Sequence, residues 1–389
     1  MQDKSRKILI LATSYLPLVG GAELAIKYLT DHLSEFSFDL VTARTTSDLQ
    51  QHERIGNVDV YRAGNASAVF DFLLPKNFLP LAIFFKARRL MALNKYDLVY
   101  VLQASQAGGA GWLLKILGYL KQPLVLNLQE GKDLSQQSFL TRLFRRLVIG
   151  SADYYIVISN YLKDFLITQG VNEKKIFVIP NGIDISEHHP DNQELKNKLG
   201  LGVGRIVITV SRLVKKNGVA DLVKAMIFVK DNYSEPVKLL IVGDAEPRLS
   251  LETDLKNLTK TLNLNSEVIF VGAVSNKDVP SYLSLADVFV RPSYSEGLGT
   301  AFLEAMAAGV PIIGTKVGGI VDFLQEGQTG LYCEVGDSQD IGRKIIQILA
   351  DNELHDRLAN QAKELVRREY DWNIIAQKFR NLYENVTGE

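Results

Sequence analysis

The sequence predicts an α/β protein with two doubly wound parallel sheets, and three observations lead to this fold class. Short apolar segments rich in β-branched residues alternate with helical patterns from one end of the chain to the other. These segments are uninterrupted, as expected for parallel strands that are buried on both faces. The chain has 389 residues, which is enough to build two hydrophobic cores.

The expected strands fall into two sets, each about the size of one doubly wound sheet. The first set is Lys7–Ala12, Phe38–Ala43, Val58–Tyr61, Leu98–Leu102, Leu124–Leu128, Tyr154–Ser159 and Phe177–Pro180. The second set is Arg205–Ser211, Lys238–Gly243, Val268–Val271, Val288–Pro292 and Pro311–Gly314. We therefore expect two Rossmann-like domains.

The segment Pro180-Asn181-Gly182-Ile183-Asp184 separates the two sets, because proline and glycine end the first set and a polar stretch follows. We expect an N-terminal domain at residues 1–184 and a C-terminal domain at residues 185–370. A last amphipathic segment, residues 371–389, is expected to pack back on the N-terminal domain.

The composition is that of an ordinary globular protein, with 47% hydrophobic and 23% charged residues. The 44 basic and 44 acidic residues balance, so the net charge does not suggest nucleic acid as a partner. Cys333 is the single cysteine, which excludes a disulfide within the chain. The N-terminus lacks the apolar region of a signal peptide, and no apolar stretch is long enough to span a bilayer. We expect a soluble, cytoplasmic protein.

The most informative segment is Ser295–Pro311, a glycine-rich loop that leads into a short helix. Gly297 and Gly299 allow backbone N–H groups to approach a ligand closely. The helix is expected to begin near Thr300 and to end at Gly309. Its N-terminus offers unpaired N–H groups and the positive end of the helix dipole to an anion such as a diphosphate.

Two carboxylates, Glu296 and Glu304, flank this predicted anion site. Carboxylates accept hydrogen bonds from hydroxyl groups, and Glu304 is placed only a short way along the helix, where a ribose would follow the diphosphate. A phosphate site between two such carboxylates predicts a pocket for a nucleotide sugar.

A second basic segment, Ser211–Gly218, begins where the strand Arg205–Ser211 ends, and ligands of α/β sheets bind at this edge. Arg212, with Lys215 or Lys216, is a candidate clamp for a diphosphate. The alternative is a solvated basic turn.

Glycines at other strand ends complete the predicted pocket. Gly243 and Gly272 each end a strand and are expected to offer main-chain contacts to the donor. Gly20 and Gly21 follow the first strand and either line the site or form a plain strand-to-helix turn. None of these segments has the glycine spacing of a dinucleotide site, which disfavours a nicotinamide-dependent dehydrogenase.

Several motifs occur in a fixed order: Pro180–Asp184, Ser211–Val214, the segment from Glu296 to Glu304, Gly318-Gly319-Ile320 and Gly327–Leu331. With these motifs the chain resembles glycosyltransferase family 4 over nearly all of its length, most densely from Ile179 to Asp337. The resemblance implies the GT-B fold, two Rossmann-like domains facing across a cleft. It also implies transfer of a sugar from a nucleotide diphosphate with retention of the anomeric configuration and without a metal ion.

The resemblance also implies roles for individual residues. Glu296 would contact the donor sugar and Glu304 the ribose, while Arg212, helped by Lys216, would stabilise the departing diphosphate. The remaining residues implied in donor binding are Gly20, Gly21, Asn181, Asn217, Gly243, Gly272, Gly297, Leu298, Gly299 and Thr300.

The chain departs from the family at two positions. The family usually has a lysine at the position of Asn217, and the adjacent Lys216 is the candidate substitute. The family also usually has a histidine after the strand that ends at Leu128, where this chain has Gln129 and Glu130. We expect one of these two side chains to orient the donor sugar. The leaving diphosphate can itself accept the proton of the acceptor, so stabilisation of its charge is the main demand on the protein.

Two segments, Ile83–Leu90 and Phe139–Leu147, mix basic and bulky apolar residues at helical spacing. Such helices can lie on an anionic membrane surface, and the alternative is an ordinary helix packed on the sheet. In the first case the enzyme would be peripheral and its acceptor a lipid-linked sugar. Val69–Pro75 is a candidate acceptor loop.

Taken together, the sequence predicts a retaining, metal-independent hexosyltransferase that needs no cofactor and uses a UDP- or GDP-linked sugar. Its expected acceptor is a saccharide or a lipid-linked saccharide in glycan or polysaccharide assembly. The alternatives are a catalytically weak partner subunit that keeps the donor fold, and a nucleotide-sugar epimerase on the same scaffold. The nucleotide, the sugar, the acceptor, the linkage and the oligomeric state stay open.

Overall fold

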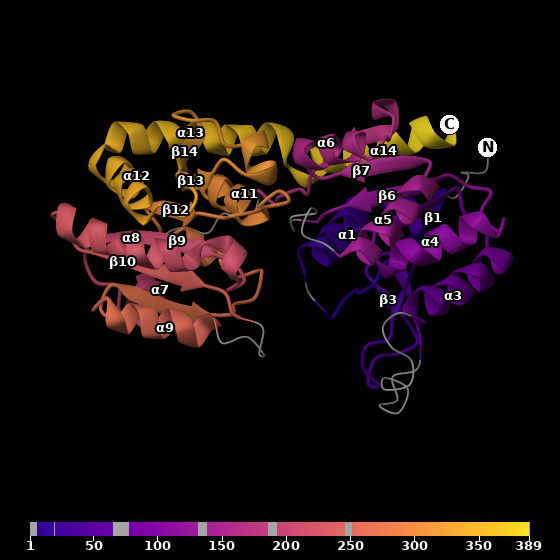
Figure 1. Cartoon of the computed structure of the whole chain (residues 1–389), viewed down its shortest axis with the longest axis horizontal. Coiled ribbons are helices and arrows are strands. Elements are labelled where there is room, and N and C mark those ends of the chain that lie inside the picture. The colour runs from indigo at the N-terminus through magenta and orange to yellow at the C-terminus, as the bar shows by residue number, and fades with distance from the viewer. Residues whose placement is uncertain are drawn as a thin grey trace. The chain divides into compact units, whose positions relative to one another are not determined.

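The computed structural model describes residues 6–18, 20–64, 78–130, 138–185, 193–245 and 251–388. The chain forms two compact units (Figure 1). The first unit contains residues 1–182 and 372–389, and the second contains residues 183–371. The chain thus passes between the units within the segment Pro180–Asp184 and again at Asp371-Trp372. The candidate acceptor loop Val69–Pro75 lies outside the described residues.

The first unit is built on an eight-stranded sheet in the order β3-β4-β2-β1-β5-β6-β7-β8. Its strands are β1 (Arg6–Leu11), β2 (Phe36–Ala43), β3 (His52–Ile55), β4 (Val58–Ala63), β5 (Leu98–Leu102), β6 (Leu124–Leu128), β7 (Tyr154–Val157) and β8 (Ile176–Val178). All neighbouring strands are parallel except β3 and β4. Its helices are α1 (Gly21–Asp31), α3 (Leu79–Leu93), α4 (Gln106–Ile116), α5 (Phe139–Ser151), α6 (Asn160–Thr168) and α14 (Trp372–Thr387).

Helix α14 joins the hydrophobic core of the first unit, although it is the last element of the chain. Its Phe379 and Tyr383 are buried, and the Tyr383 ring packs edge-on against Phe36 with ring centroids 4.8 Å apart. Arg380 of the same helix forms an ion pair with Glu35 at 2.5 Å. These contacts hold the C-terminal helix on the sheet formed by the N-terminal half.

The second unit is built on a six-stranded, fully parallel sheet in the order β11-β10-β9-β12-β13-β14. Its strands are β9 (Arg205–Val210), β10 (Val237–Val242), β11 (Val268–Gly272), β12 (Val288–Arg291), β13 (Ile312–Thr315) and β14 (Gly330–Cys333). Its helices are α7 (Gln193–Lys198), α8 (Val219–Asn232), α9 (Leu251–Thr261), α10 (Val279–Leu283), α11 (Thr300–Ala307), α12 (Ser338–Ala350) and α13 (Asn352–Glu369).

Every strand expected from the sequence is present, because each buried apolar run had enough β-branched residues to distinguish it from a helix. Strands β3 and β14 were not expected. The exposed β3 pairs with β4 through a turn at Gly56, which has a φ of 60°. Its sequence His52–Ile55 is short and mostly polar, so it lacked the apolar signal of a buried strand.

In both sheets the strand order reverses at one central strand. In the first unit, β1 pairs with β2 on one side and β5 on the other. In the second unit, β9 pairs with β10 and β12. At such a topological switch point the loops on either side diverge, which leaves a crevice at the carboxyl ends of the strands. None of the described helices is both long and apolar enough to cross a membrane.

Candidate active site

The switch point of the second unit brings together the two loops that carry the three predicted catalytic residues, Arg212, Lys216 and Glu296. The loop after β9 contains Arg212, Lys216 and Asn217, and the loop after β12 contains Glu296 and the start of α11. Both loops were predicted from the sequence to bind a ligand, but their position beside each other was not. Their proximity follows from the pairing of β9 with β12.

The loop after β9 is fixed by Asn217. The Asn217 side chain is only 2% exposed and its Nδ2 donates to the carbonyl oxygen of Arg212 at 2.7 Å. The Arg212 side chain, in contrast, is exposed. The arrangement therefore anchors the backbone of Arg212 and leaves its guanidinium at the surface of the loop, where an anionic ligand can reach it.

Two close contacts join the β9 loop to the β12 loop. Gly218 has a φ of 70°, and a β-carbon there would lie 2.0 Å from the carbonyl oxygen of Pro292, so only glycine fits. The backbone N–H of Tyr294 donates to the carbonyl of Lys216 at 2.7 Å. Lys216 Nζ also reaches the carbonyl of Ser295, at the long distance of 3.5 Å.

Glu296 is held at both its backbone and its carboxylate. A β-carbon on Gly318, whose φ is 53°, would lie 1.8 Å from the Glu296 carbonyl oxygen, and the N–H of Gly319 donates to the same oxygen at 3.3 Å. The carboxylate Oε2 accepts from Arg291 Nη2 at 2.5 Å, and both side chains are 10% exposed. The motif Gly318-Gly319-Ile320 thus serves to position Glu296.

Arg291, the last residue of β12, is a functional candidate that the sequence analysis missed. In addition to Glu296, its Nη2 donates to Asn217 Oδ1 at 3.2 Å. Its Nε is buried and has no hydrogen-bond partner. The signal was present in the sequence, because an arginine inside an expected fully buried strand requires a partner in the core.

Helix α11 begins at the switch point, close to its expected start. Its N-cap residue is Gly299, with a φ of 91° and no side chain to cap the first amides. The predicted phosphate contacts Gly297 to Thr300 lie here, but the N–H of Gly297 already donates to Glu296 Oε1 at 3.2 Å. Leu298 is buried, so its side chain serves packing. Glu304 lies half-buried on the same helix.

The glycines at the neighbouring strand ends have different roles. The N–H of Gly243 donates to the carbonyl of Gly272 at 2.8 Å. A β-carbon on Gly243 would lie 1.9 Å from the Ser211 carbonyl oxygen, so this glycine is required by packing. Gly272 has a φ of 82° and open space where a side chain would be. Gly272 is therefore the one of the two beside which a ligand has room.

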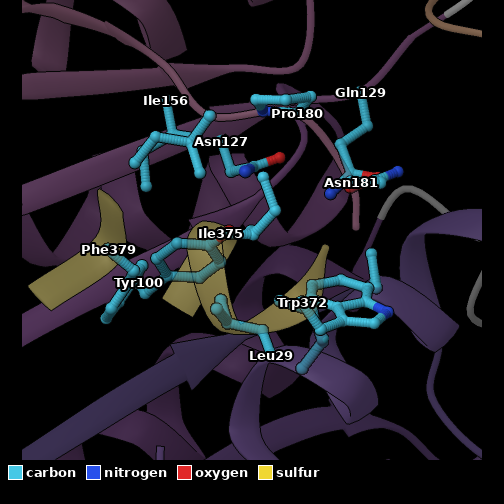
Figure 2. Close-up of a pocket in the computed structure, with 13 residues that line it drawn as sticks. Leu29, Tyr100, Asn127, Gln129, Ile156, Pro180, Asn181, Trp372, Ile375 and Phe379 are labelled. Carbon is cyan, nitrogen blue, oxygen red and sulfur yellow. The ribbon is translucent and has the colours of Figure 1, made fainter. Parts of the chain in front are cut away.

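The remaining predicted residues belong to the first unit. Gly20 caps α1, and Gly21 begins this helix with open space beside it. Asn181 Nδ2 donates to Gln129 Oε1 at 3.3 Å. Both residues line a small cavity, and Figure 2 shows Trp372 of α14 below them in this view.

Glu130 is occupied by an ion pair. Its Oε2 accepts from Arg145 Nη2 at 2.8 Å, with side-chain exposures of 15% and 9%. Of the two residues expected to orient the donor sugar, Gln129 thus keeps more of its hydrogen-bonding capacity for a ligand, because its amide nitrogen can still donate.

The switch point of the first unit contains a further unusual residue. Gln103, just after β5, has a φ of 69°, a conformation that is rare outside glycine and that often marks a functional site. Beside it, Thr13 Oγ1 and Ser105 Oγ lie 2.9 Å apart and so share a hydrogen bond between the loops after β1 and β5. A positive φ at a glutamine gives no signal in sequence patterns.

Comparison with known proteins agrees with this arrangement. The family model for Glycosyltransferase Family 4 matches residues 19–187, and the model for Glycosyl transferases group 1 matches residues 191–365. An uncharacterised glycosyltransferase of Methanocaldococcus jannaschii is 25% identical over 98% of this chain and 99% of its own length.

Two further similarities are informative. A GDP-mannose-dependent α-(1-6)-phosphatidylinositol monomannoside mannosyltransferase of Mycobacterium tuberculosis is 29% identical, over 61% of this chain and 62% of its own. The solved structure of Anabaena HepE in complex with UDP and glucose has a TM-score of 0.81 and 22% identity, over 98% of this chain and 100% of that chain. The predicted fold class is confirmed, since these two parallel-sheet units have the GT-B fold. The chain belongs to glycosyltransferase family 4.

Proposed function

We propose that the protein transfers a sugar from a UDP- or GDP-linked donor to a saccharide or lipid-linked saccharide, with retention at the anomeric carbon. The observation that carries this proposal is the buried carboxylate of Glu296 beside the uncapped N-terminus of α11. The solved HepE complex contains UDP and glucose, and the mycobacterial relative is GDP-mannose-dependent. These two proteins support a nucleotide sugar as the donor. They do not decide between a uridine and a guanosine nucleotide.

The chemistry of the site suits departure of a diphosphate. Negative charge builds on the diphosphate as the sugar–phosphate bond breaks, and the positive end of the α11 dipole stabilises charge there. The exposed guanidinium of Arg212 adds a charge-assisted hydrogen bond to the same group. Glu296 accepts hydrogen bonds from sugar hydroxyls and so fixes the donor ring relative to the breaking bond.

In the proposed retaining reaction, the acceptor hydroxyl attacks the anomeric carbon on the same face from which the diphosphate departs. The leaving diphosphate accepts the proton of that hydroxyl, so the protein need not provide a titrating base. This explains how Gln129, which cannot titrate, can stand where the family usually has a histidine. Gln129 then contributes a hydrogen bond to the sugar, as expected from the sequence.

We further propose that the reaction needs no metal ion or other cofactor, because the helix dipole and the basic side chains supply the charge stabilisation. Transfer activity should therefore persist in excess EDTA. A loss of activity that added Mg²⁺ or Mn²⁺ restores would contradict this part of the proposal.

Release of nucleoside diphosphate from a panel of UDP- and GDP-sugars, with saccharide and lipid-linked acceptors, tests the function. The wild type should release nucleotide only with acceptor present, and Glu296→Ala should release little. A wild type as inactive as Glu296→Ala would instead favour a catalytically weak partner subunit. Conversion of the donor sugar without any acceptor would favour an epimerase.

Helix α5 of the first unit, on the expected acceptor side, has an exposed face suited to a membrane surface. On α5, Phe139, Leu140 and Leu143 are 70%, 74% and 47% exposed, and Arg142 and Arg146 are exposed beside them. We propose that this face binds the anionic surface of a bilayer, where apolar side chains enter the headgroup region and arginines pair with lipid phosphates. A lipid-linked acceptor in glycan or polysaccharide assembly, at the cytoplasmic face of a membrane, fits such a surface.

The corresponding segment on α3 fits the alternative interpretation better. Ile83, Phe84 and Leu90 are buried against the sheet, while Phe85 is 59% exposed. Most of the apolar residues of Ile83–Leu90 thus belong to the core, and α5 carries the surface in question.

A further inference from the structure

Arg291 is a buried cation whose full hydrogen-bonding capacity is not used by the protein. Its side chain is 10% exposed, and burial of a charge is costly unless the charge is paired. Nη2 donates to Glu296 and to Asn217, but Nε has no partner although it is buried. An unpaired buried N–H costs free energy that a ligand acceptor would recover.

Arg291 also lies where the two loops of the switch point meet. Through Glu296 it contacts the loop after β12, and through Asn217 it contacts the loop after β9. The diphosphate predicted at the N-terminus of α11 would lie next to the residue that Arg291 binds. Arginine suits this place, because its planar fork can contact a carboxylate and a phosphate oxygen at once.

Position 217 explains why a cation is needed from β12. The resemblance to family 4 assigns a lysine there, but Asn217 is neutral and both ends of its amide are used, by the Arg212 carbonyl and by Arg291. Lys216, the candidate substitute, donates from its Nζ to the Ser295 carbonyl at the long distance of 3.5 Å. A lysine at 217 beside Arg291 would instead place two cations in contact inside the protein.

We propose that Arg291 and Asn217 form a matched pair in which Arg291 supplies, from β12, the positive charge that a lysine at position 217 would otherwise supply. Arg291 positions the Glu296 carboxylate, and its Nε–H donates to a diphosphate oxygen when the donor binds. This inference rests on the proposed function, since it assigns the residue that recognises the diphosphate of the same donor.

A double-mutant cycle with Arg291→Met, Asn217→Lys and the double variant tests the pairing. Binding of UDP and GDP, and of UMP and GMP, is measured by calorimetry. Arg291→Met should weaken binding of the preferred diphosphate by roughly tenfold to a hundredfold, and binding of the monophosphate much less. Asn217→Lys alone should also weaken it, whereas the double variant should recover most of the affinity and of the sugar-transfer rate.

Controls separate this role from a structural one. Arg205→Met removes an arginine of the same unit that pairs with Asp287 at the opposite end of β9, and it should leave diphosphate affinity unchanged. Arg291→Lys keeps the charge without the fork and should retain part of the diphosphate affinity. If Arg291→Met fails to fold, Arg291→Lys and the double variant still test the inference.

The outcomes are distinct. The inference is overturned if Arg291→Met weakens diphosphate and monophosphate binding equally or not at all, or if the double variant is no better than the weaker single variant. The proposed function itself fails if the wild type binds none of these nucleotides and transfers no sugar.

Discussion

Gly318 fixes the backbone of Glu296, and Arg291 fixes its carboxylate. Gly318 lies against the Glu296 carbonyl oxygen with a positive φ, so a methyl group there meets both backbone strain and a direct clash. Gly318→Ala should lower the free energy of unfolding by about 1–3 kcal/mol and reduce turnover, since Glu296 must shift. Denaturant unfolding and steady-state kinetics measure the two effects.

Gly327→Ala is the matched control, because Gly327 has a φ of 71° but open space for a side chain. It should lose stability through strain alone and keep its turnover. Equal turnover in the two variants would show that the Gly318 contact does not position Glu296.

Arg212 is expected to act mainly in the transition state. Because charge on the diphosphate grows as the sugar leaves, Arg212→Ala should lower kcat more than donor affinity. The side chain is exposed, so the substitution should not disturb folding. Arg343→Ala, at another exposed arginine of the same unit, is the control. An unchanged rate at saturating donor would remove Arg212 from the catalytic residues.

Glu304 is predicted to bind the ribose. Glu304→Ala should weaken binding of the preferred nucleoside diphosphate by roughly 1–3 kcal/mol if the lost hydrogen bonds are buried. Calorimetry with UDP and GDP measures the change. If the affinity for the preferred nucleotide stays the same, Glu304 does not contact the ribose.

At the residue scale, the sequence predicted the ligand-binding loops but not which side chains form ion pairs with them. Glu296, Arg212 and Asn217 were identified from motifs whose residues are close in the chain. The ion pairs of Arg291 with Glu296 and of Arg145 with Glu130 were not predicted. In each pair the arginine belongs to a segment that was interpreted in another way, as a buried strand or as a helix on the sheet or on a membrane surface, so local patterns concealed the pair.

Helix α5 carries the proposed membrane surface on its exposed face, and substitutions on that face test the proposal. Leu140→Gln combined with Leu143→Gln should reduce binding to vesicles rich in anionic lipid, because both side chains are exposed and contribute little to the core. Cosedimentation with anionic and with neutral vesicles measures binding. Val203→Gln, at a residue that is 95% exposed in the second unit, is the control.

Wild-type protein should bind anionic vesicles more tightly than neutral ones, and added salt should weaken the binding. If the wild type ignores vesicles, or if the double variant binds as well as the wild type, α5 is not a membrane surface.

At the element scale, prediction succeeded where burial imposed a strong pattern. Buried strands such as β5 and β10 are continuous apolar runs, and each was expected within a residue or two of its observed ends. Strand β14 was noted only as a glycine motif, Gly327–Leu331, because Gly330 begins a strand of four residues. Such a short strand forms because its neighbour β13 provides the pairing, which is tertiary information.

For the molecule as a whole, Cys333 offers a probe of the second unit. It is a free, buried thiol on β14, and burial raises its pKa to about 12. The thiol should therefore stay protonated and react very slowly with thiol reagents at neutral pH, since only the thiolate is nucleophilic. Labelling should require opening of the second unit, and a bound nucleoside diphosphate should slow it further.

Mass spectrometry of timed labelling gives the rates with and without UDP or GDP. Fast labelling of the native protein at neutral pH would mean that β14 is far less protected than its burial indicates. A rate unaffected by a nucleotide that binds would mean that the nucleotide does not stabilise the second unit.

The architecture of the whole chain was predictable because it repeats one rule twice. Each half alternates buried strands and helices, each forms its own doubly wound sheet, and each sheet has one switch point. The sequence could not reveal which loops meet at these points, because that depends on strand order. The proximity of the Arg212 loop and the Glu296 loop is the consequence that matters most for function.

The most direct measurement is a crystal structure of the protein with a bound UDP- or GDP-sugar that is not turned over. We expect the diphosphate to lie against the main-chain amides at the start of α11, and a hydroxyl group of the sugar to lie within hydrogen-bond distance of Glu296. A donor bound elsewhere, with the loop from Ser295 to Thr300 making no contact to it, would show that this loop is not the donor site.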